Sequence, residues 1–113
     1  MPKNRLTVEE FLKFKPTRGE FPWNKKEDGI IVIQVPKFQG KLGKTFCKLL
    51  KKENVFYANL DKIGSLVWEH CDGNHTVEEI LEILKQNFPE EENLDQRLFL
   101  FLRQMQALNY LIF

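Results

Sequence analysis

Apolar residues near the start of the chain recur at helical spacing. Thr7 and Glu10 stand at the spacing of a capping box, in which each side chain bonds the backbone N–H of the other residue. Val8, Phe11, Leu12 and Phe14 follow, so a short helix is expected over residues 6–15, ended by Pro16 and Gly19.

An alternating pattern replaces the helical one in the next segment. Phe21 and Trp23 alternate with polar neighbours, and residues 26–29 supply the residue types of a turn. A β-branched run follows over residues 30–35 and is closed by Pro36. This pattern predicts a β-hairpin.

A lysine-rich segment separates the hairpin from a third predicted strand. Residues 37–52 hold six lysines and no acid, and their apolar residues are spaced for one face of a helix. An amphipathic helix with a lysine-covered face is therefore expected there. Residues 55–58 are of types favoured in strands and predict a short third strand.

Three helices are predicted after the third strand. The first has apolar residues at helical spacing over residues 60–71 and ends at the breaker residues 72–74. The second begins at a capping box formed by Thr76 and Glu79 and stops before Pro89. The third is expected to open near three consecutive glutamates, a favourable charge at a helix N-terminus.

That last helix, expected over about residues 90–108, has more apolar residues than one face can hold. A core-facing stripe, with Leu102 at its margin, accounts for Leu94, Leu98, Phe101, Leu102, Met105 and Leu108. Phe99 and Leu100 lie on opposite flanks of that stripe. Either the sheet or the N-terminal helix covers these flanks, or a peptide groove lies beside the helix. The residues expected to line such a groove are Arg97, Phe99, Leu100, Arg103 and Gln104.

The order of these elements predicts an α+β fold. A small three-stranded antiparallel sheet followed by a three-helix bundle is a winged-helix-like arrangement. We expect residues 1–20 to form an N-terminal helical extension and residues 21–113 to form the winged-helix domain, with a basic connector at 37–53. A sheet of three strands is narrow, so at least one edge should remain unpaired.

Composition sharpens this picture mainly through the distribution of charge. The 113 residues have a formal net charge of +1, and 42% of them are hydrophobic, which is typical of a single globular domain. Residues 1–53 carry 13 Lys and Arg against 6 Asp and Glu, whereas residues 54–113 carry 4 against 10. No apolar run reaches the roughly 18 residues of a membrane span, and the first residues lack the apolar segment of a signal peptide. A cytoplasmic location is therefore expected.

Few residues suggest catalytic or metal chemistry. Cys47 and Cys71 belong to no CxxC pair, so reduced thiols are expected. His70 and Cys71 are neighbours whose side chains diverge by about 100° on a helix, which argues against a zinc site with His75. Cys47 has lysine neighbours but no accompanying base. We expect neither enzyme activity nor a metal or cofactor.

DNA binding is the alternative function, because many regulators combine a winged helix with a basic stretch. Acids far outnumber the one basic residue, Lys85, between Glu69 and Asp95, whereas a helix that reads DNA is rich in Lys and Arg. The basic segment 37–52 also suggests contact with an anionic membrane, although its apolar face is short. Both alternatives are less favoured than peptide binding.

Four motifs in the second half of the chain occur in a characteristic order. They are Leu60, Asp61, Gly64, Ser65, Val67 and Trp68; Cys71, Asp72 and Gly73; Thr76, Val77, Glu79 and Ile80; and Arg97, Leu98, Phe101 and Leu102. This pattern resembles the PqqD family, the peptide chaperones of pyrroloquinoline quinone biosynthesis and related peptide recognition elements. The hairpin ending at Val35 and Pro36 resembles the first two strands of that family.

The resemblance implies a non-catalytic protein that binds the leader of a ribosomally made precursor peptide and presents it to a modifying enzyme, often a radical SAM maturase. In that family the leader adds a strand beside the third strand and lies against the last helix. The resemblance thus assigns peptide binding to Val55, Phe56, Tyr57 and Ala58, and to the groove residues of the last helix. On this basis, Phe56→Pro is expected to weaken leader binding by removing a strand N–H. The basic connector is expected to attract an acidic leader.

Overall fold

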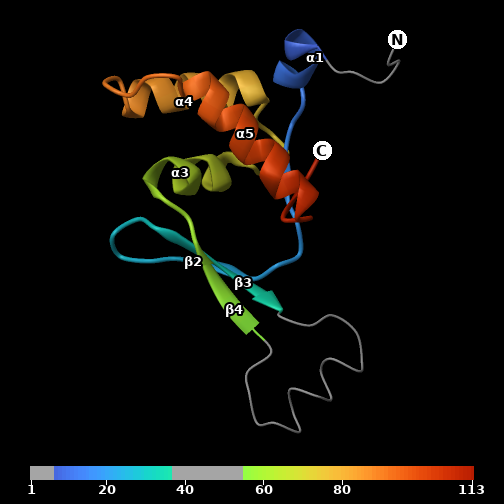
Figure 1. Ribbon diagram of the computed structural model, residues 1–113, viewed down its shortest axis with the longest axis vertical. Coiled ribbons are helices and arrows are strands. Elements are labelled where there is room, and N and C mark those ends of the chain that lie inside the picture. Colours follow the sequence, from blue (N-terminus) through green and yellow to red (C-terminus); the bar gives the residue numbers. More distant parts are fainter. Residues whose placement is uncertain (1–6, 37–54) are drawn as a thin grey trace, which may run out of the picture. The chain divides into compact units, whose positions relative to one another are not determined.

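The computed structural model describes residues 7–36 and 55–113, and these residues form helices and short strands (Figure 1). The elements are α1 (Val8–Leu12), β1 (Thr17–Arg18), β2 (Trp23–Lys25), β3 (Ile31–Pro36), β4 (Val55–Asn59), α3 (Lys62–His70), α4 (Val77–Asn87), α5 (Leu94–Ala107) and β5 (Leu111–Ile112). The helix predicted over 37–52 lies outside the described residues. The observed elements confirm the α+β class, with a three-stranded antiparallel sheet and three consecutive helices after it.

The chain divides into two compact units. The sheet unit spans Phe21–Lys62, and the helical unit combines Met1–Glu20 with Ile63–Phe113. Strands β2, β3 and β4 belong to the sheet unit, whereas α1, α4, α5 and the small β1–β5 pair belong to the helical unit.

The sheet unit contains the predicted hairpin. The Lys26 N–H donates to Ile30 O at 2.9 Å, and the Gly29 N–H donates to Lys26 O at 2.9 Å. Gly29 has φ +87°, the left-handed conformation that a three-residue hairpin loop requires at this position. The Ile30 N–H donates to the Asp28 carboxylate at 3.0 Å. Local residue chemistry therefore fixes the register of β2 against β3.

The helical unit has an apolar core contributed by its three long helices. Val67, Trp68, Leu84, Leu98 and Leu102 are all fully buried. The predicted capping box is present at the start of α4: Glu79 N–H donates to Thr76 Oγ1 at 3.1 Å, and Thr76 N–H donates to Glu79 Oε1 at 2.7 Å. These bonds satisfy two of the N–H groups that a helix start leaves unpaired.

The last helix differs from the prediction in its start and in its buried face. It begins at Leu94, after Asn93 in the left-handed conformation (φ +59°), so the three glutamates precede it. Leu102 is fully buried and lies in the middle of the stripe, whereas Leu108 is 55% exposed. The buried stripe of α5 therefore consists of Leu94, Leu98, Leu102 and Met105, which are spaced by four, four and three residues.

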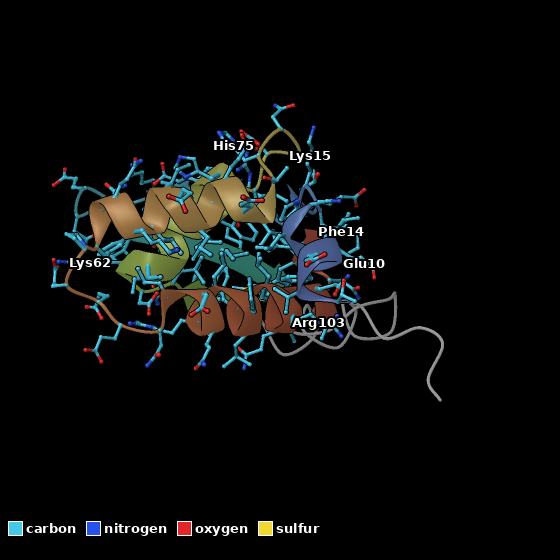
Figure 2. The ribbon with its side chains drawn as sticks, turned by 90° about the horizontal axis from the view of Figure 1, so that it is seen from above. Glu10, Phe14, Lys15, Lys62, His75 and Arg103 are labelled. Atoms are coloured by element: carbon cyan, nitrogen blue, oxygen red, sulfur yellow. The ribbon has the colours of Figure 1, made fainter. Side chains whose placement is uncertain are left out.

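Within the helical unit, the N-terminal segment packs on the later helices, as Figure 2 shows for α1 at one end of α4 and α5. The predicted Thr7 cap is present, because Glu10 N–H donates to Thr7 Oγ1 at 3.1 Å. The helix ends at Leu12, three residues before the predicted end, with Lys13 N–H bonded to Glu10 O. Strands β1 and β5, which the sequence pattern did not predict, then pair antiparallel.

Candidate functional site

Strand β4 is an edge strand of the described sheet. The strand order is β2-β3-β4, so β4 pairs with β3 on one side, and no described strand pairs with its other side. The register places Ala58 opposite Ile33 and Tyr57 opposite Gln34. An edge strand presents backbone N–H and C=O groups that a second chain can bond.

The register also identifies which β4 residues direct their backbone groups outward. In an antiparallel pair, residues that bond the neighbouring strand alternate with residues that do not. The Leu60 N–H donates to Ile31 O at 2.9 Å, so Ala58 and Phe56, two and four residues before Leu60, also bond β3. The outward groups therefore belong to the alternate residues, Val55, Tyr57 and Asn59.

This alternation corrects the expectation for Phe56→Pro. The Phe56 N–H faces β3, opposite Val35, and not the open edge. A proline there would break a bond within the sheet itself, so weaker peptide binding would not identify the binding edge. Tyr57 is the informative position, because its N–H faces outward.

The side chains of β4 differ in exposure. Tyr57 is 55% exposed and Asn59 is exposed, whereas Ala58 is half-buried. Successive side chains of a strand lie on opposite faces, so Tyr57 and Asn59 share one face of the sheet. For Val55 and Phe56, the structure describes the backbone only.

The groove residues predicted on α5 lie on the helical unit and have different surroundings. Leu100 is 60% exposed, and Arg103 and Gln104 are exposed. Arg97 is engaged by an acid, with its Nη1 atom 3.0 Å from Glu91 Oε2. These α5 residues belong to the helical unit, whereas the β4 residues belong to the sheet unit.

Phe99 is covered on one side by the N-terminal helix. Its ring is 5.3 Å from that of Phe11, edge to face, and Phe11 also contacts Phe14 and Phe113. The apolar flanks of α5 were expected either to be covered by another element or to border a peptide groove. On the flank that carries Phe99, the N-terminal helix provides the cover. Leu100, on the other flank, keeps its apolar surface exposed.

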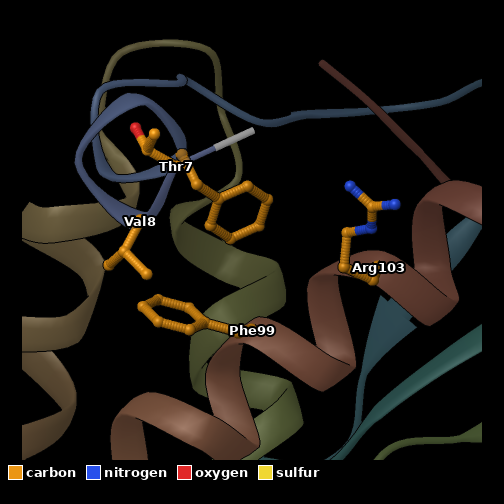
Figure 3. Close-up of a pocket in the computed structure, with 5 residues that line it drawn as sticks. Thr7, Val8, Phe99 and Arg103 are labelled. Atoms are coloured by element: carbon orange, nitrogen blue, oxygen red, sulfur yellow. The ribbon is translucent and has the colours of Figure 1, made fainter. Parts of the chain in front are cut away.

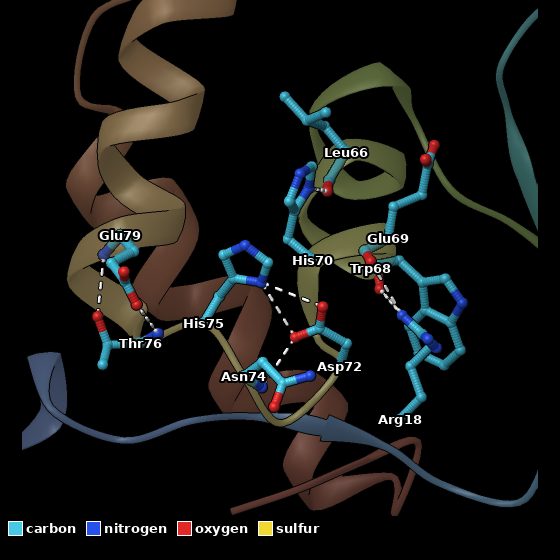
Figure 4. A network of polar contacts seen from close by, with 10 residues as sticks. All are labelled: Arg18, Leu66, Trp68, Glu69, His70, Asp72, Asn74, His75, Thr76 and Glu79. Atoms are coloured by element: carbon cyan, nitrogen blue, oxygen red, sulfur yellow. Dashed lines mark hydrogen bonds and ion pairs between the residues drawn. The ribbon is translucent and has the colours of Figure 1, made fainter.

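The loop between α3 and α4 is held by polar contacts that give the Asp72–Gly73 motif a structural role (Figure 4). Asp72 Oδ1 accepts from the Asn74 N–H at 2.9 Å and lies 3.0 Å from His75 Nδ1. The Asn74 backbone bond, followed by the His75 hydrogen bond, lowers the pKa of the Asp72 carboxyl to about 2. Gly73 has φ +80°, and its N–H donates to Pro16 O.

Asp72→Asn is expected to destabilise the fold at neutral pH but not in strong acid. The folded-state pKa of Asp72, about 2, lies below its usual value of 3.8, so the ionised form stabilises the folded chain. This contribution is complete above about pH 5 and is lost as the pH falls toward 2. Urea denaturation at pH 7 and pH 2 should show a lower midpoint for the variant at pH 7 and converging midpoints at pH 2. Equal differences at both pH values would contradict this role of the charge.

Two contacts tie the same region to the N-terminal segment. Arg18 donates from Nη1 to Trp68 O at 2.9 Å and to Glu69 O at 3.0 Å, satisfying carbonyls at the end of α3. Cys71 is fully buried, and this burial raises the pKa of its thiol to about 12 despite the nearby Arg18 charge. A thiol with such a pKa is a poor nucleophile at neutral pH.

Both histidines near the α3–α4 loop, which the sequence did not favour as zinc ligands, have partners within the protein. The membrane contact suggested for residues 37–52 lies outside the described residues. His70 Nδ1 lies 2.8 Å from Leu66 O, and His75 is paired with Asp72. Residues 7–36 and 55–113 contain no cluster of three His, Cys, Asp or Glu side chains arranged to hold a metal ion. None of the helices described in these ranges has the length and apolar character to cross a membrane.

Comparison with known proteins identifies a family for the chain. No curated protein and no solved structure gave a match. Residues 48–111 match the family model described as Coenzyme PQQ synthesis protein D (PqqD), a family of non-catalytic accessory proteins. The matched range contains β4, α3, α4 and α5, while α1, β2 and β3 precede it. Because the match covers more than half of its residues, this chain belongs to the PqqD family.

Proposed function

We propose that this protein binds the leader of a ribosomally synthesised precursor peptide and presents it in the cytoplasm to a modifying enzyme, such as a radical SAM maturase. The protein itself performs no catalysis in this proposal. The observation that carries it is the edge of β4 with which no described strand pairs, and β4 lies within the residues matched to the family. Family membership supports a role as a peptide-binding chaperone in PQQ-type biosynthesis.

Strand addition to β4 is the proposed binding mechanism. The outward N–H and C=O groups of Val55, Tyr57 and Asn59 would bond the backbone of an extended leader. Backbone pairing gives affinity for any extended peptide, while side chains on the sheet faces select alternate leader residues. Exposed Tyr57 would contact such a residue on its face of the sheet. Phe56 and Ala58 would support this site through their bonds to β3.

Helix α5 is proposed as the second peptide contact. Leu100 offers an exposed apolar surface, and Arg97, Arg103 and Gln104 offer donors around it. Phe99 lies on the flank that Phe11 partly covers, so any contact it makes with the leader would be beside that helix. Ordering a disordered leader costs roughly 2–5 kcal/mol or more, so two contact surfaces would be needed to offset that cost while still allowing release.

Amide hydrogen exchange followed by NMR tests the proposal. The genes beside this one are first searched for a short precursor peptide, and the probe is a synthetic peptide with the leader sequence of such a precursor. Binding at the edge should slow exchange at Tyr57 and Asn59, whereas Ala58 and Leu60, whose N–H groups face β3, should change little. Amides from Arg97 to Gln104 should shift in the same titration.

Two other results would contradict the proposed function. A leader that shifts only residues 37–52 would show that the site has been placed wrongly. A protein that ignores the leader and instead retards a promoter duplex in a gel would be a winged-helix regulator and not a peptide chaperone.

A further inference from the structure

A small apolar pocket lies between α1 and α5 within the helical unit (Figure 3). Its volume is about 240 Å³, and its lining residues are Thr7, Val8, Phe11, Phe99 and Arg103. Figure 3 shows the side chains of Val8 and Phe99 pointing toward each other, with Arg103 one turn further along α5. Three of the five lining residues, Thr7, Val8 and Phe11, precede the residues matched to the family, so much of this pocket is built by a segment outside that match.

Packing of aromatic rings defines the floor of the pocket. Phe11 is only 7% exposed, and its edge-to-face contact with Phe99 joins the two helices. Val8, by contrast, is 60% exposed although it is apolar. Its methyl groups and the Phe99 ring therefore offer unburied apolar surface on two walls of the same pocket.

Among the described residues that line the pocket, Arg103 is the charged one. Within residues 7–36 and 55–113, its guanidinium has neither a hydrogen bond nor an ion pair, whereas the guanidinium of Arg97 on the same helix is paired with Glu91. A guanidinium carries five N–H donors in a fork that matches a carboxylate. The pocket thus combines an apolar hollow with a donor group suited to an anion.

We propose that this pocket receives one apolar side chain of a peptide, with a carboxylate adjacent to that side chain bound by Arg103. The volume supports a side chain and not a cofactor, because pockets for drug-sized ligands hold about 300–1,000 Å³. A cavity of roughly 150 Å³ is enough for benzene, so an aromatic or branched side chain fits. The inference rests on the proposed function in one respect: the peptide that supplies the apolar side chain and its adjacent carboxylate is the precursor.

A pair of small probes tests the chemistry independently of any leader. The full chain, labelled with ¹⁵N, is titrated with N-acetyl-L-phenylalanine and with N-acetyl-L-phenylalanine amide. The acid should shift the amides of Val8, Phe11, Phe99 and Arg103, and the amide should bind about threefold more weakly, as expected for a partly solvated ion pair. In Arg103→Gln this preference should disappear, whereas Lys85→Gln, an exposed charge change on α4, should retain it.

Filling the pocket gives a second test that does not depend on charge. Val8→Trp places an indole over the hollow and should abolish the probe shifts, and exposed Val8 can be replaced without opening the core. Leu108→Trp is the matched control, because Leu108 is similarly exposed and outside the pocket. Unchanged binding in Val8→Trp, or shifts confined to other residues, would overturn the proposal. So would a concentration-dependent dimer that Val8→Trp dissociates, because the occupant would then be a second copy.

The outcomes separate this inference from the proposed function. If the small probes bind at the pocket but the leader does not slow amide exchange in β4, the leader-binding function is contradicted and the pocket proposal stands. If the leader slows amide exchange in β4 but the small probes shift no amide of α1 or α5, only the pocket proposal is contradicted.

Discussion

Replacing Tyr57 by proline is expected to weaken binding of the leader peptide by about tenfold while leaving the protein folded. The change removes the central outward N–H of β4 and leaves a leader carbonyl without a donor, a loss of roughly 1–3 kcal/mol. Proline is tolerated in an edge strand when its missing N–H would have faced away from the sheet, which is the situation at Tyr57. Isothermal titration with the leader measures the loss, and the amide spectrum reports whether the sheet is intact.

Two variants make this result interpretable. Tyr57→Thr keeps the N–H and a strand-favouring side chain, so it should retain the backbone contribution to binding. Ala58→Pro removes an N–H that bonds β3, so it should lower the denaturation midpoint of the protein itself. If folded Tyr57→Pro binds the leader as tightly as the unchanged protein, the leader does not add a strand at β4.

The parts of the fold that sequence predicted correctly are those coded by neighbouring residues. The hairpin loop depends on a glycine that accepts φ +87°, and the start of α4 depends on Thr76 and Glu79 bonding each other's backbone. Each signal lies within a few residues of its effect. The hairpin and the capping box were therefore predictable from local spacing.

Features that depend on distant partners were missed. Thr17 and Arg18 pair with β5, more than ninety positions later, and two-residue strands leave no periodic pattern. Leu102 was expected at the margin of the buried stripe, but the packing of α5 places it at the centre and leaves Leu108 exposed. A helical wheel gives relative angles, whereas neighbouring elements determine which angle faces the core.

The candidate site also has features that the sequence predicted and features that depend on distant partners. The element order already predicted an open edge in a three-stranded sheet, and the structure places β4 there. Which backbone groups face outward depends on the parity of the register, and a shift of one residue exchanges Phe56 with Tyr57. The pocket between α1 and α5 was not predictable either, because Val8 and Arg103 come together only through the packing of Phe11 on Phe99.

Phe11→Ala is expected to destabilise the protein by about 3 kcal/mol, because truncating a buried phenylalanine typically costs 3–5 kcal/mol. Phe11 is 7% exposed, and its ring lies 5.3–6.0 Å from those of Phe14, Phe99 and Phe113, distances at which aromatic pairs attract. A loss of this size is a large fraction of the 5–15 kcal/mol by which most domains are stable.

Urea denaturation followed by tryptophan fluorescence would measure this loss, with Val8→Ala as the control on the same helix. Val8 is 60% exposed, so its truncation should change the free energy of unfolding by less than about 0.5 kcal/mol. Equal stability of Phe11→Ala and the unchanged protein would mean that α1 is a dispensable extension. The expected loss would instead make α1 part of the core that supports α5, so that a segment outside the family match would determine how firmly a family helix is held.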